Sequence, residues 1–168
     1  MSIQEKYKLN GSLNISGDKS ISHRAVILGS MAQGISRFKG FLCSHDCLNT
    51  LAIYRQLGVK IDQEGTAVTV HGRGVDQLKN PDEDCNVGNS GTAIRLIAGM
   101  VSGTPLSVTL TGDESIQKRP MGRIIDPLQA MGAQISASNK QPPLHIQGTS
   151  NLVSGFHYNM PIASAQVK

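Results

Sequence analysis

The chain has 168 residues, which is enough for one domain, since a domain typically has about 150 residues. Its apolar residues make up 39% of the total, enough to bury a core, yet no apolar run approaches the roughly 20 residues of a membrane-spanning helix. The first residues also lack the apolar stretch of a signal peptide. We therefore expect a cytoplasmic protein with no membrane partner.

The net charge of +4 and the pI of about 9.1 make nucleic acid a partner class to consider. However, aromatic residues make up only 4%, tryptophan is absent and the basic residues are scattered. Stacking platforms and basic tracts are therefore missing, and no nucleic-acid partner is expected. A mildly basic cleft for a small anion explains the charge equally well.

The three cysteines are an odd number in a chain of this size, which favours free thiols over a disulfide framework. Cys43 and Cys47 are separated by three residues and have no second pair, whereas structural zinc takes four ligands. The segment is better interpreted as a loop leading into a helix. We expect no metal.

Two stretches of the chain share one helical pattern. The first, SISHRAVILGSMAQG, runs from Ser20, a favoured N-cap, to Gly34, a plausible helix stop. The second, NSGTAIRLIAGMVSG, runs from Asn89, also a favoured cap, to Gly103. The two align without gaps at an offset of 69 residues (89 − 20).

The residues after each of these stretches also repeat. A second helix is predicted to end at Gly58 in the first case and at Gly132 in the second, and a strand comes after each. A further short strand then closes on Gly72 or on Gly148. The pattern indicates an α/β unit of about 70–75 residues, made of helix, strand, helix, strand and strand.

The spacing after each unit predicts a third copy. Asn89 follows Gly72 by 17 residues (89 − 72), and Ser164 follows Gly148 by 16 (164 − 148). Ser164 is therefore expected to cap the first helix of a third unit.

The predicted helix starts suit anions, because a helix N-terminus exposes unpaired N–H groups and the positive end of its dipole. Lys19 precedes the first cap, and Arg24 lies one turn beyond Ser20 on the same face. The segment is not a P-loop, since Asp18 separates Gly17 from the lysine. A solvated helix start remains the alternative.

At the second cap, Gly88 and Gly91 flank Asn89 and Ser90. Glycine at a helix start lets a ligand approach the backbone closely, although a packing glycine is the alternative. No GxGxxG pattern is present, so a dinucleotide fold is not supported.

A third basic element is Arg119, which the following proline biases towards an extended backbone. An arginine can grip a carboxylate or phosphate with two parallel hydrogen bonds, and an exposed charged loop is the alternative. The five histidines show no consistent partner pattern, so no histidine base is predicted.

Four motifs, GDKSISHRA, GNSGTAIR, QKRPM and SAQVK in this order, resemble the 5-enolpyruvylshikimate-3-phosphate synthase (3-phosphoshikimate 1-carboxyvinyltransferase) family. The resemblance extends from about Leu13 to Lys168. The sister family that acts on UDP-N-acetylglucosamine shares the fold but lacks the first two motifs, and is the weaker match.

The resemblance implies an α/β fold of two domains, each an inverse α/β barrel of three βαβαββ units around a pseudo-threefold axis. Residues 1–13 would contribute a strand to the other domain. Residues 14–168 would form an incomplete domain, with units at about 14–84 and 85–160 and the start of a third at 161–168.

The implied reaction transfers the carboxyvinyl group of phosphoenolpyruvate to the 5-hydroxyl of shikimate 3-phosphate, in the shikimate pathway of aromatic amino acid biosynthesis. It needs no cofactor, and the whole enzyme is expected to be a monomer. Members of the family are much longer, and their general-base carboxylate has no counterpart here. The chain alone is therefore predicted to be inactive.

The resemblance also assigns ligands residue by residue. Shikimate 3-phosphate would be bound by Lys19, Ser20, Arg24, Ser164, Ala165 and Gln166. Phosphoenolpyruvate would be bound by Lys19, Asn89, Gly91, Arg119 and Gln166. Many members carry serine at Ala165, so a side-chain contact is not implied there. Some herbicide-tolerant members carry alanine at Gly91, so this chain, if complete, would be predicted to be glyphosate-sensitive.

Two other functions remain open at this point: a non-catalytic anion-binding module, and the transferase acting on UDP-N-acetylglucosamine. The coding sequence after Lys168 distinguishes the binding module from an enzyme. A stop codon there favours the module, whereas an open reading frame that continues the third helix favours the enzyme.

Overall fold

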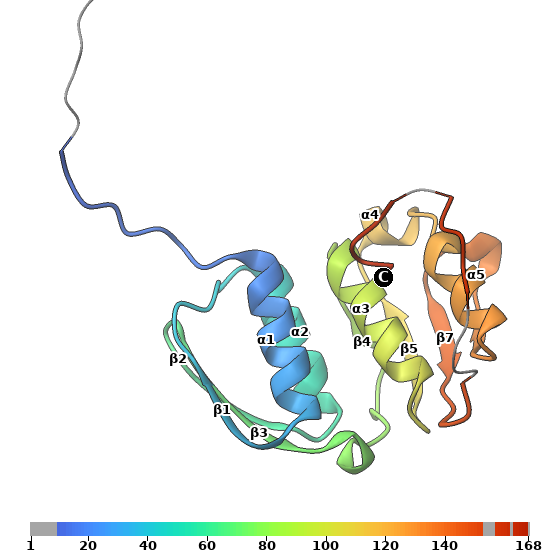
Figure 1. The fold of residues 1–168 in the computed structure, drawn as a ribbon, viewed down its shortest axis with the longest axis horizontal. Coiled ribbons are helices and arrows are strands. Elements are labelled where there is room, and N and C mark those ends of the chain that lie inside the picture. Colours follow the sequence, from blue (N-terminus) through green and yellow to red (C-terminus); the bar gives the residue numbers. More distant parts are fainter. Residues whose placement is uncertain (1–9, 153–156, 162, 168) are drawn as a thin grey trace, which may run out of the picture.

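The structure, a computed structural model, describes residues 10–152, 157–161 and 163–167. Most of the strand expected within residues 1–13 falls outside these residues, as do residues 153–156 of the expected second unit and residues 162 and 168 of the expected third. Residues 10–18 form neither helix nor strand and lead into the first helix (Figure 1).

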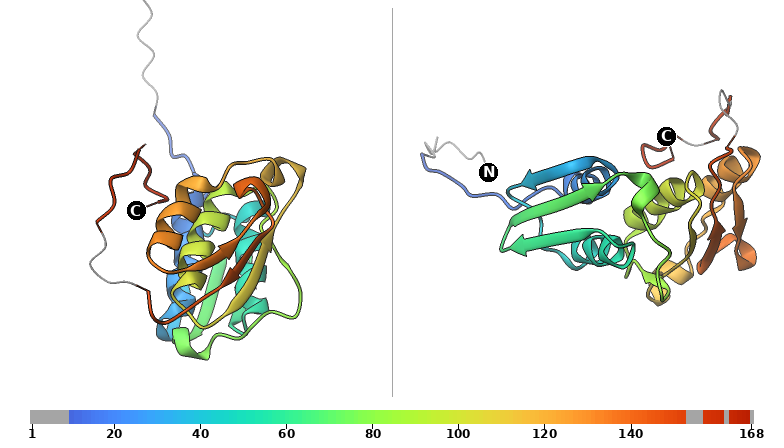
Figure 2. Two further views of the ribbon diagram at one scale, coloured as in Figure 1. Left: turned by 90° about the vertical axis from the view of Figure 1, so that its right-hand side faces the viewer. Right: turned by 90° about the horizontal axis from the view of Figure 1, so that it is seen from below.

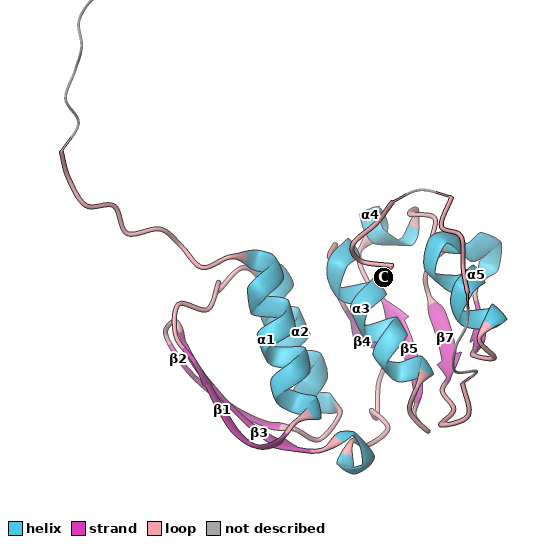
Figure 3. Ribbon diagram, in the orientation of Figure 1, coloured by secondary structure: helices cyan, strands magenta, loops and turns pink. Residues whose placement is uncertain are grey.

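The first half of the chain is a three-stranded antiparallel sheet with two helices on one face (Figures 1 and 3). Its elements are α1 (Lys19–Met31), β1 (Gln33–Phe38), α2 (His45–Gln56), β2 (Lys60–Glu64) and β3 (Ala67–Arg73). The strand order is β1-β3-β2, so β3 lies at the centre and pairs with both neighbours.

The second half is a four-stranded sheet in the order β4-β5-β7-β6, with β4 parallel to β5 and the other pairs antiparallel. Its elements are β4 (Cys85–Asn86), α3 (Gly91–Ser102), β5 (Ser107–Thr111), α4 (Glu114–Gln117), α5 (Gly122–Ala130), β6 (Gln134–Ser136) and β7 (Leu144–Gln147). Single 3₁₀ turns lie at η1 (Val75–Gln77) and η2 (Ser138–Lys140).

The predicted order of helix, strand, helix, strand and strand is present in both halves, with the short α4 added in the second. The second half also has the leading strand β4 of a βαβαββ unit, whereas the described part of the first half has no strand before α1. The helices α1 and α2 lie between the first sheet and α3, so the two halves meet through their helices (Figure 2).

A glycine with the same packing role ends the last strand of each half. A Cβ atom on Gly72 would collide with the carbonyl oxygens of Gly29 and Ala32 at the end of α1. A Cβ atom on Gly148 would collide with those of Val101 and Thr104 at the end of α3. The strand and the helix can approach this closely only because glycine has no side chain. The two glycines therefore support the repeat independently of the order of elements.

The predicted helix caps are wrong by one or two residues. Asp18, not Ser20, caps α1, because its Oδ1 accepts a hydrogen bond from the Ile21 amide at 2.7 Å. Ser90, not Asn89, caps α3, and its Oγ accepts from the amide three residues on at 3.1 Å. The caps are therefore 72 residues apart (90 − 18), and the gapless offset of 69 is incorrect.

The helix ends were predicted with mixed success. Gly34 is not the end of α1, which ends at Met31; the glycine lies in β1 with a φ of 113°. Gly103 does cap α3. Gly58 and Gly132 follow the C-caps of α2 and α5 with φ values of 88° and 99°, the left-handed backbone that glycine adopts at such ends.

The expected start of a third helix at Ser164 is a turn. The Val167 amide donates to the Ser164 carbonyl oxygen at 3.3 Å, and no helix begins among the described residues of this segment. Among the described residues, we find no helix with the length and apolarity to cross a membrane.

Candidate anion-binding site

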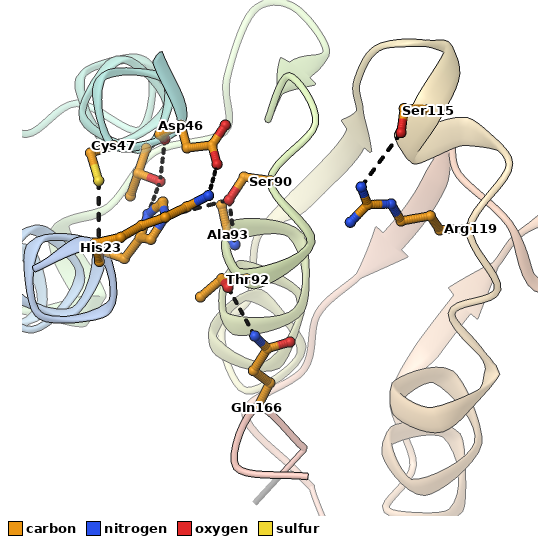
Figure 4. A network of polar contacts seen from close by, with 11 residues as sticks. His23, Asp46, Cys47, Ser90, Thr92, Ala93, Ser115, Arg119 and Gln166 are labelled. Carbon is orange, nitrogen blue, oxygen red and sulfur yellow. Dashed lines mark hydrogen bonds and ion pairs between the residues drawn. The ribbon is translucent and has the colours of Figure 1, made fainter. Parts of the chain in front are cut away.

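The start of α1 carries the first group of predicted ligands. Lys19 and Ser20 are exposed, and the Arg24 Nη1 atom donates to the Ser20 carbonyl oxygen at 3.2 Å. Lys19 also forms an ion pair with Asp46 of α2, a carboxylate that the sequence reasoning did not include (Figure 4). Arg24 therefore folds back over Ser20, four residues before it on the same face of the helix, whereas the Lys19 ammonium group is held by α2.

The start of α3 carries the second group. Gly91 is buried, and the Arg95 Nη1 atom, one turn further on, donates to the Gly91 carbonyl oxygen at 2.8 Å. A Cβ atom on Gly91 would lie 2.9 Å from Nη1 of Arg95 and 3.0 Å from Nη1 of Arg119. The absence of a side chain on Gly91 therefore leaves the space in which two guanidinium groups meet.

Arg119 reaches this place from the segment between α4 and α5. Its Nη2 atom donates to the Ser115 hydroxyl at 3.4 Å (Figure 4). The segment is held by the η2 turn, because the Met121 amide donates to the Lys140 carbonyl oxygen at 2.7 Å and the Gln141 side chain donates to the Lys118 carbonyl oxygen at 3.0 Å. These two contacts fix the backbone on either side of Arg119 and do not involve its guanidinium group.

The C-terminal segment returns to the same helix start. The Gln166 amide nitrogen donates to the Thr92 hydroxyl at 2.9 Å (Figure 4). Its amide oxygen accepts from Arg95 at 3.2 Å. Ser164 is partly buried in the same turn and Ala165 is exposed. The structure thus brings the last motif to the start of α3, although three strands, β5, β6 and β7, separate the two in the sequence.

A cavity of about 470 Å³ lies beside these groups. Its charged lining consists of Arg95, Arg119, Arg123 and Asp126. The aspartate already pairs with Lys140, whose Nζ atom is 2.6 Å from Oδ1. Burial, together with the charges of the other two arginines, lowers the pKa of Arg95. Three guanidinium groups with one carboxylate, itself paired elsewhere, make the cavity attractive to anions.

Sequence reasoning missed Arg95 and Arg123. Arg95 lies four residues after Gly91, so helical spacing could have placed it on the same face as the glycine. Arg123 lies four residues after Arg119, but Pro120 and a helix start separate the two, so no regular spacing links them. Asn89, a predicted ligand, is exposed in the turn just before α3.

The cysteines do not form a metal-binding group. Cys43 is exposed and donates to the Gly65 carbonyl oxygen at 3.2 Å, whereas Cys47 is buried, and burial raises the pKa of its thiol. All three cysteines are free thiols, as predicted. No group of three or more His, Cys, Asp or Glu side chains within the described ranges could hold a metal ion.

The fold and the site together define an α/β protein built of repeated units, with basic side chains gathered at two helix starts. The model of the EPSP synthase (3-phosphoshikimate 1-carboxyvinyltransferase) family matches residues 3–168, and the chain belongs to this family. The family predicted from the four motifs is thereby confirmed.

Comparison with individual relatives points to the same family. The chain is 49% identical over 168 residues to the 3-phosphoshikimate 1-carboxyvinyltransferase of Bacillus cytotoxicus, covering 99% of this chain and 39% of that protein. It is 51% identical over 162 residues to the protein of the same name from Shouchella clausii, covering 95% and 37%. The chain therefore spans well under half the length of these relatives.

The fold is also confirmed by a solved structure. The chain matches the solved structure of an EPSP synthase from Acinetobacter baumannii with a TM-score of 0.89 and 44% identity. The match covers 94% of this chain and 36% of that one. The predicted incomplete enolpyruvyl transferase-like α/β fold accordingly describes this chain.

Proposed function

We propose that this chain is the part of a 3-phosphoshikimate 1-carboxyvinyltransferase that holds the anionic groups of both substrates. The observation that carries the proposal is the convergence of three guanidinium groups on one cavity at the start of α3, beside Gly91 and Gln166. Phosphoenolpyruvate and shikimate 3-phosphate each bear a phosphate and a carboxylate, so their binding requires such unpaired positive charge.

Shikimate 3-phosphate is assigned to the start of α1 and the C-terminal turn. Lys19 and Arg24 supply positive charge, and the Ser20 hydroxyl is exposed beside them. Ser164, Ala165 and Gln166 supply the opposite side, the alanine through its backbone. In this assignment the substrate competes with Asp46 for the Lys19 ammonium group.

Phosphoenolpyruvate is assigned to the start of α3. Arg119 can bind its phosphate or carboxylate with two parallel hydrogen bonds, and the first amides of the helix add donors and a positive dipole end. Lys19, Asn89 and Gln166 complete this subsite, and Gly91 keeps it open. The two subsites then share Lys19 and Gln166, so both substrates meet between α1 and α3.

The proposed chemistry is addition followed by elimination. The 5-hydroxyl oxygen attacks C2 of phosphoenolpyruvate while C3 gains a proton, and the hydroxyl proton passes to a base. C3 then loses a proton, and the C–O bond to phosphate breaks, which restores the double bond and releases inorganic phosphate. No electrons are exchanged with an outside partner, so the reaction needs no redox cofactor. The basic residues lower the barrier by offsetting the charge that gathers when two anions react.

The proposal also covers the organisation of the whole protein. Residues 14–84 and 85–160 are the first two units of a domain, 161–168 begins the third, and 1–13 belongs to the other domain. The base and further ligands come from sequence beyond this chain, so we propose that the 168 residues alone do not turn over. The whole protein is proposed to be a cytoplasmic monomer whose partners are its two small substrates, with no nucleic acid.

The test is an assay of phosphate release by the longest polypeptide that the reading frame of this chain encodes. We expect release only when both substrates are present, and none from the 168-residue chain. Failure of the longer polypeptide would overturn the proposed reaction. Turnover by the shorter one would overturn the proposed need for additional residues.

A further inference from the structure

His23 lies completely buried on α1, between the starts of α1 and α3. Its Nδ1 atom is 2.8 Å from the Thr50 hydroxyl on α2, and its Nε2 atom is 3.4 Å from the Ser90 hydroxyl that caps α3 (Figure 4). Thr50 and Ser90 are also buried. One imidazole ring therefore joins three helices from both halves of the chain.

Ser90, His23, Thr50 and the Asp46 carbonyl oxygen form a row of hydrogen bonds, and the donors and acceptors favour one direction of donation along it. The Ser90 Oγ atom already accepts from the Ala93 amide, so its own hydrogen is available to donate to Nε2 of His23. Nδ1–H then donates to the Thr50 hydroxyl, which in turn donates to the Asp46 carbonyl oxygen at 3.3 Å. The reverse direction would leave the Ser90 hydrogen without an acceptor among the hydrogen bonds of the described residues. A buried donor without an acceptor is costly.

The charges around His23 favour the same neutral form. Lys19 and Arg24 on its own helix are positive, Asp46 on α2 is negative, and α3 presents the neutral Ser90 hydroxyl. Burial is the largest influence on the pKa of His23 and lowers it; the two basic residues act in the same direction and Asp46 acts against them. A ring that stays neutral keeps one donor and one acceptor, which the row requires.

We propose that His23 is a positioning residue whose neutral imidazole, protonated at Nδ1, ties the start of α3 to α1 and α2. The tie fixes the distance between the basic side chains of α1 and the first amides of α3, and it acts through the Ser90 cap. Its consequence for substrate binding rests on the proposed function, whereas the tie itself does not. His23 touches no substrate in this proposal.

Two amide variants at position 23 test the contact with Thr50 and the contact with Ser90 separately. The amide of asparagine falls near Nδ1 of histidine and can still donate to Thr50, whereas the longer glutamine reaches the place of Nε2 and can still accept from Ser90. His23→Leu removes both contacts. We expect His23→Leu and His23→Asn to raise the hydrogen-exchange rate of the Ala93 amide roughly tenfold, and His23→Gln to raise it far less.

The measurements are nitrogen NMR of the His23 ring and hydrogen exchange of the Ala93 amide in the 168-residue chain, together with calorimetric titration with shikimate 3-phosphate. We expect the Nδ1–H tautomer at neutral pH, faster exchange in the leucine and asparagine variants than in the glutamine variant, and weaker binding wherever the Ala93 amide exchanges faster. An imidazolium ion, the Nε2–H tautomer, or equal exchange in His23→Gln and His23→Asn would overturn the proposal.

The two proposals fail in different ways. If the wild-type chain shows the expected tautomer and exchange order but does not bind shikimate 3-phosphate, the tie stands and the assigned substrate is wrong for this chain. If it binds this ligand equally well with leucine at position 23, the tie does not position the site.

Discussion

Gly91 and Arg119 lie so close that a Cβ atom on the glycine would be 3.0 Å from Nη1 of the arginine. The same atom would be 2.9 Å from Nη1 of Arg95, so a methyl group here would meet two guanidinium groups at once. Both are the far ends of flexible side chains and can move aside. The site, rather than the fold, is therefore sensitive to the size of residue 91.

Gly91→Ala is expected to weaken binding of inorganic phosphate or phosphoenolpyruvate by roughly tenfold, because Arg95 and Arg119 must separate. The free energy of unfolding should stay equal or rise by up to about 1 kcal/mol, since alanine is the better helix former. Calorimetric titration and urea unfolding measure the two quantities. Unchanged affinity would show that the guanidinium groups do not act together, and a large loss of stability would show that they cannot move.

Lys140 is expected to control the charge of the cavity through Asp126. Lys140→Met should weaken phosphate binding several-fold, because the freed carboxylate then offsets one arginine, while Asp126→Asn should strengthen it. The pair is largely exposed, so each variant should change the free energy of unfolding by no more than about 1 kcal/mol. The two variants serve as controls for each other, and a change in the same direction in both would contradict the electrostatic explanation.

Stability is expected to fall in mild acid because of His23. Its pKa lies below the ordinary 6.5 when folded, so below that pH the unfolded chain binds the proton more readily. The contribution is complete above about pH 6.5 and is lost as the pH falls, by at most about 1.4 kcal/mol per pH unit.

Urea unfolding as a function of pH measures this loss. His23→Leu should flatten the profile between neutral pH and mild acid, whereas replacement of the exposed His145 by glutamine should leave it as in the wild type. A profile that is equally steep in His23→Leu would assign the loss to other groups.

Gly72 and Gly148 are expected to be intolerant of alanine, because backbone oxygens occupy the place of a side chain and cannot move away. Gly72→Ala or Gly148→Ala should lower the free energy of unfolding by at least about 1–3 kcal/mol. Gly99 of α3 is the matched control, since nothing lies within 4 Å of its Cβ position. Gly99→Ala should stabilise by up to about 1 kcal/mol. Equal effects at all three positions would contradict the close approach of strand and helix.

The sequence predicted the order of elements well, because glycines end α2, α3 and α5 and alternating apolar residues form the strands. In β3, for example, Val68 and Val70 are buried while Ala67 and Thr69 are not. The helix starts were less predictable. Asp18 and Ser20 are both good caps, and only the backbone conformation decides between them: Asp18 is extended with a ψ of 135°, and Ser20 is already helical.

The site was predicted only in part, for a similar reason. Ser20 and Arg24 are four residues apart on one helix, and Lys19 directly precedes Ser20, so spacing alone places the three at one helix start. The meeting of Arg95 with Arg119 depends on how the segment after α4 folds back onto α3, and the ties made by His23 cross between distant helices. Such long-range contacts leave no local pattern in the sequence.

The division of the site into two anion subsites is tested most directly by titrating shikimate 3-phosphate and phosphoenolpyruvate into Arg24→Ala and Arg119→Ala. The longest polypeptide that the reading frame encodes is the sample. We predict that Arg24→Ala weakens shikimate 3-phosphate by roughly tenfold or more with little effect on phosphoenolpyruvate, and that Arg119→Ala does the reverse. Equal losses for both ligands in both variants, or no loss in either, would contradict the account.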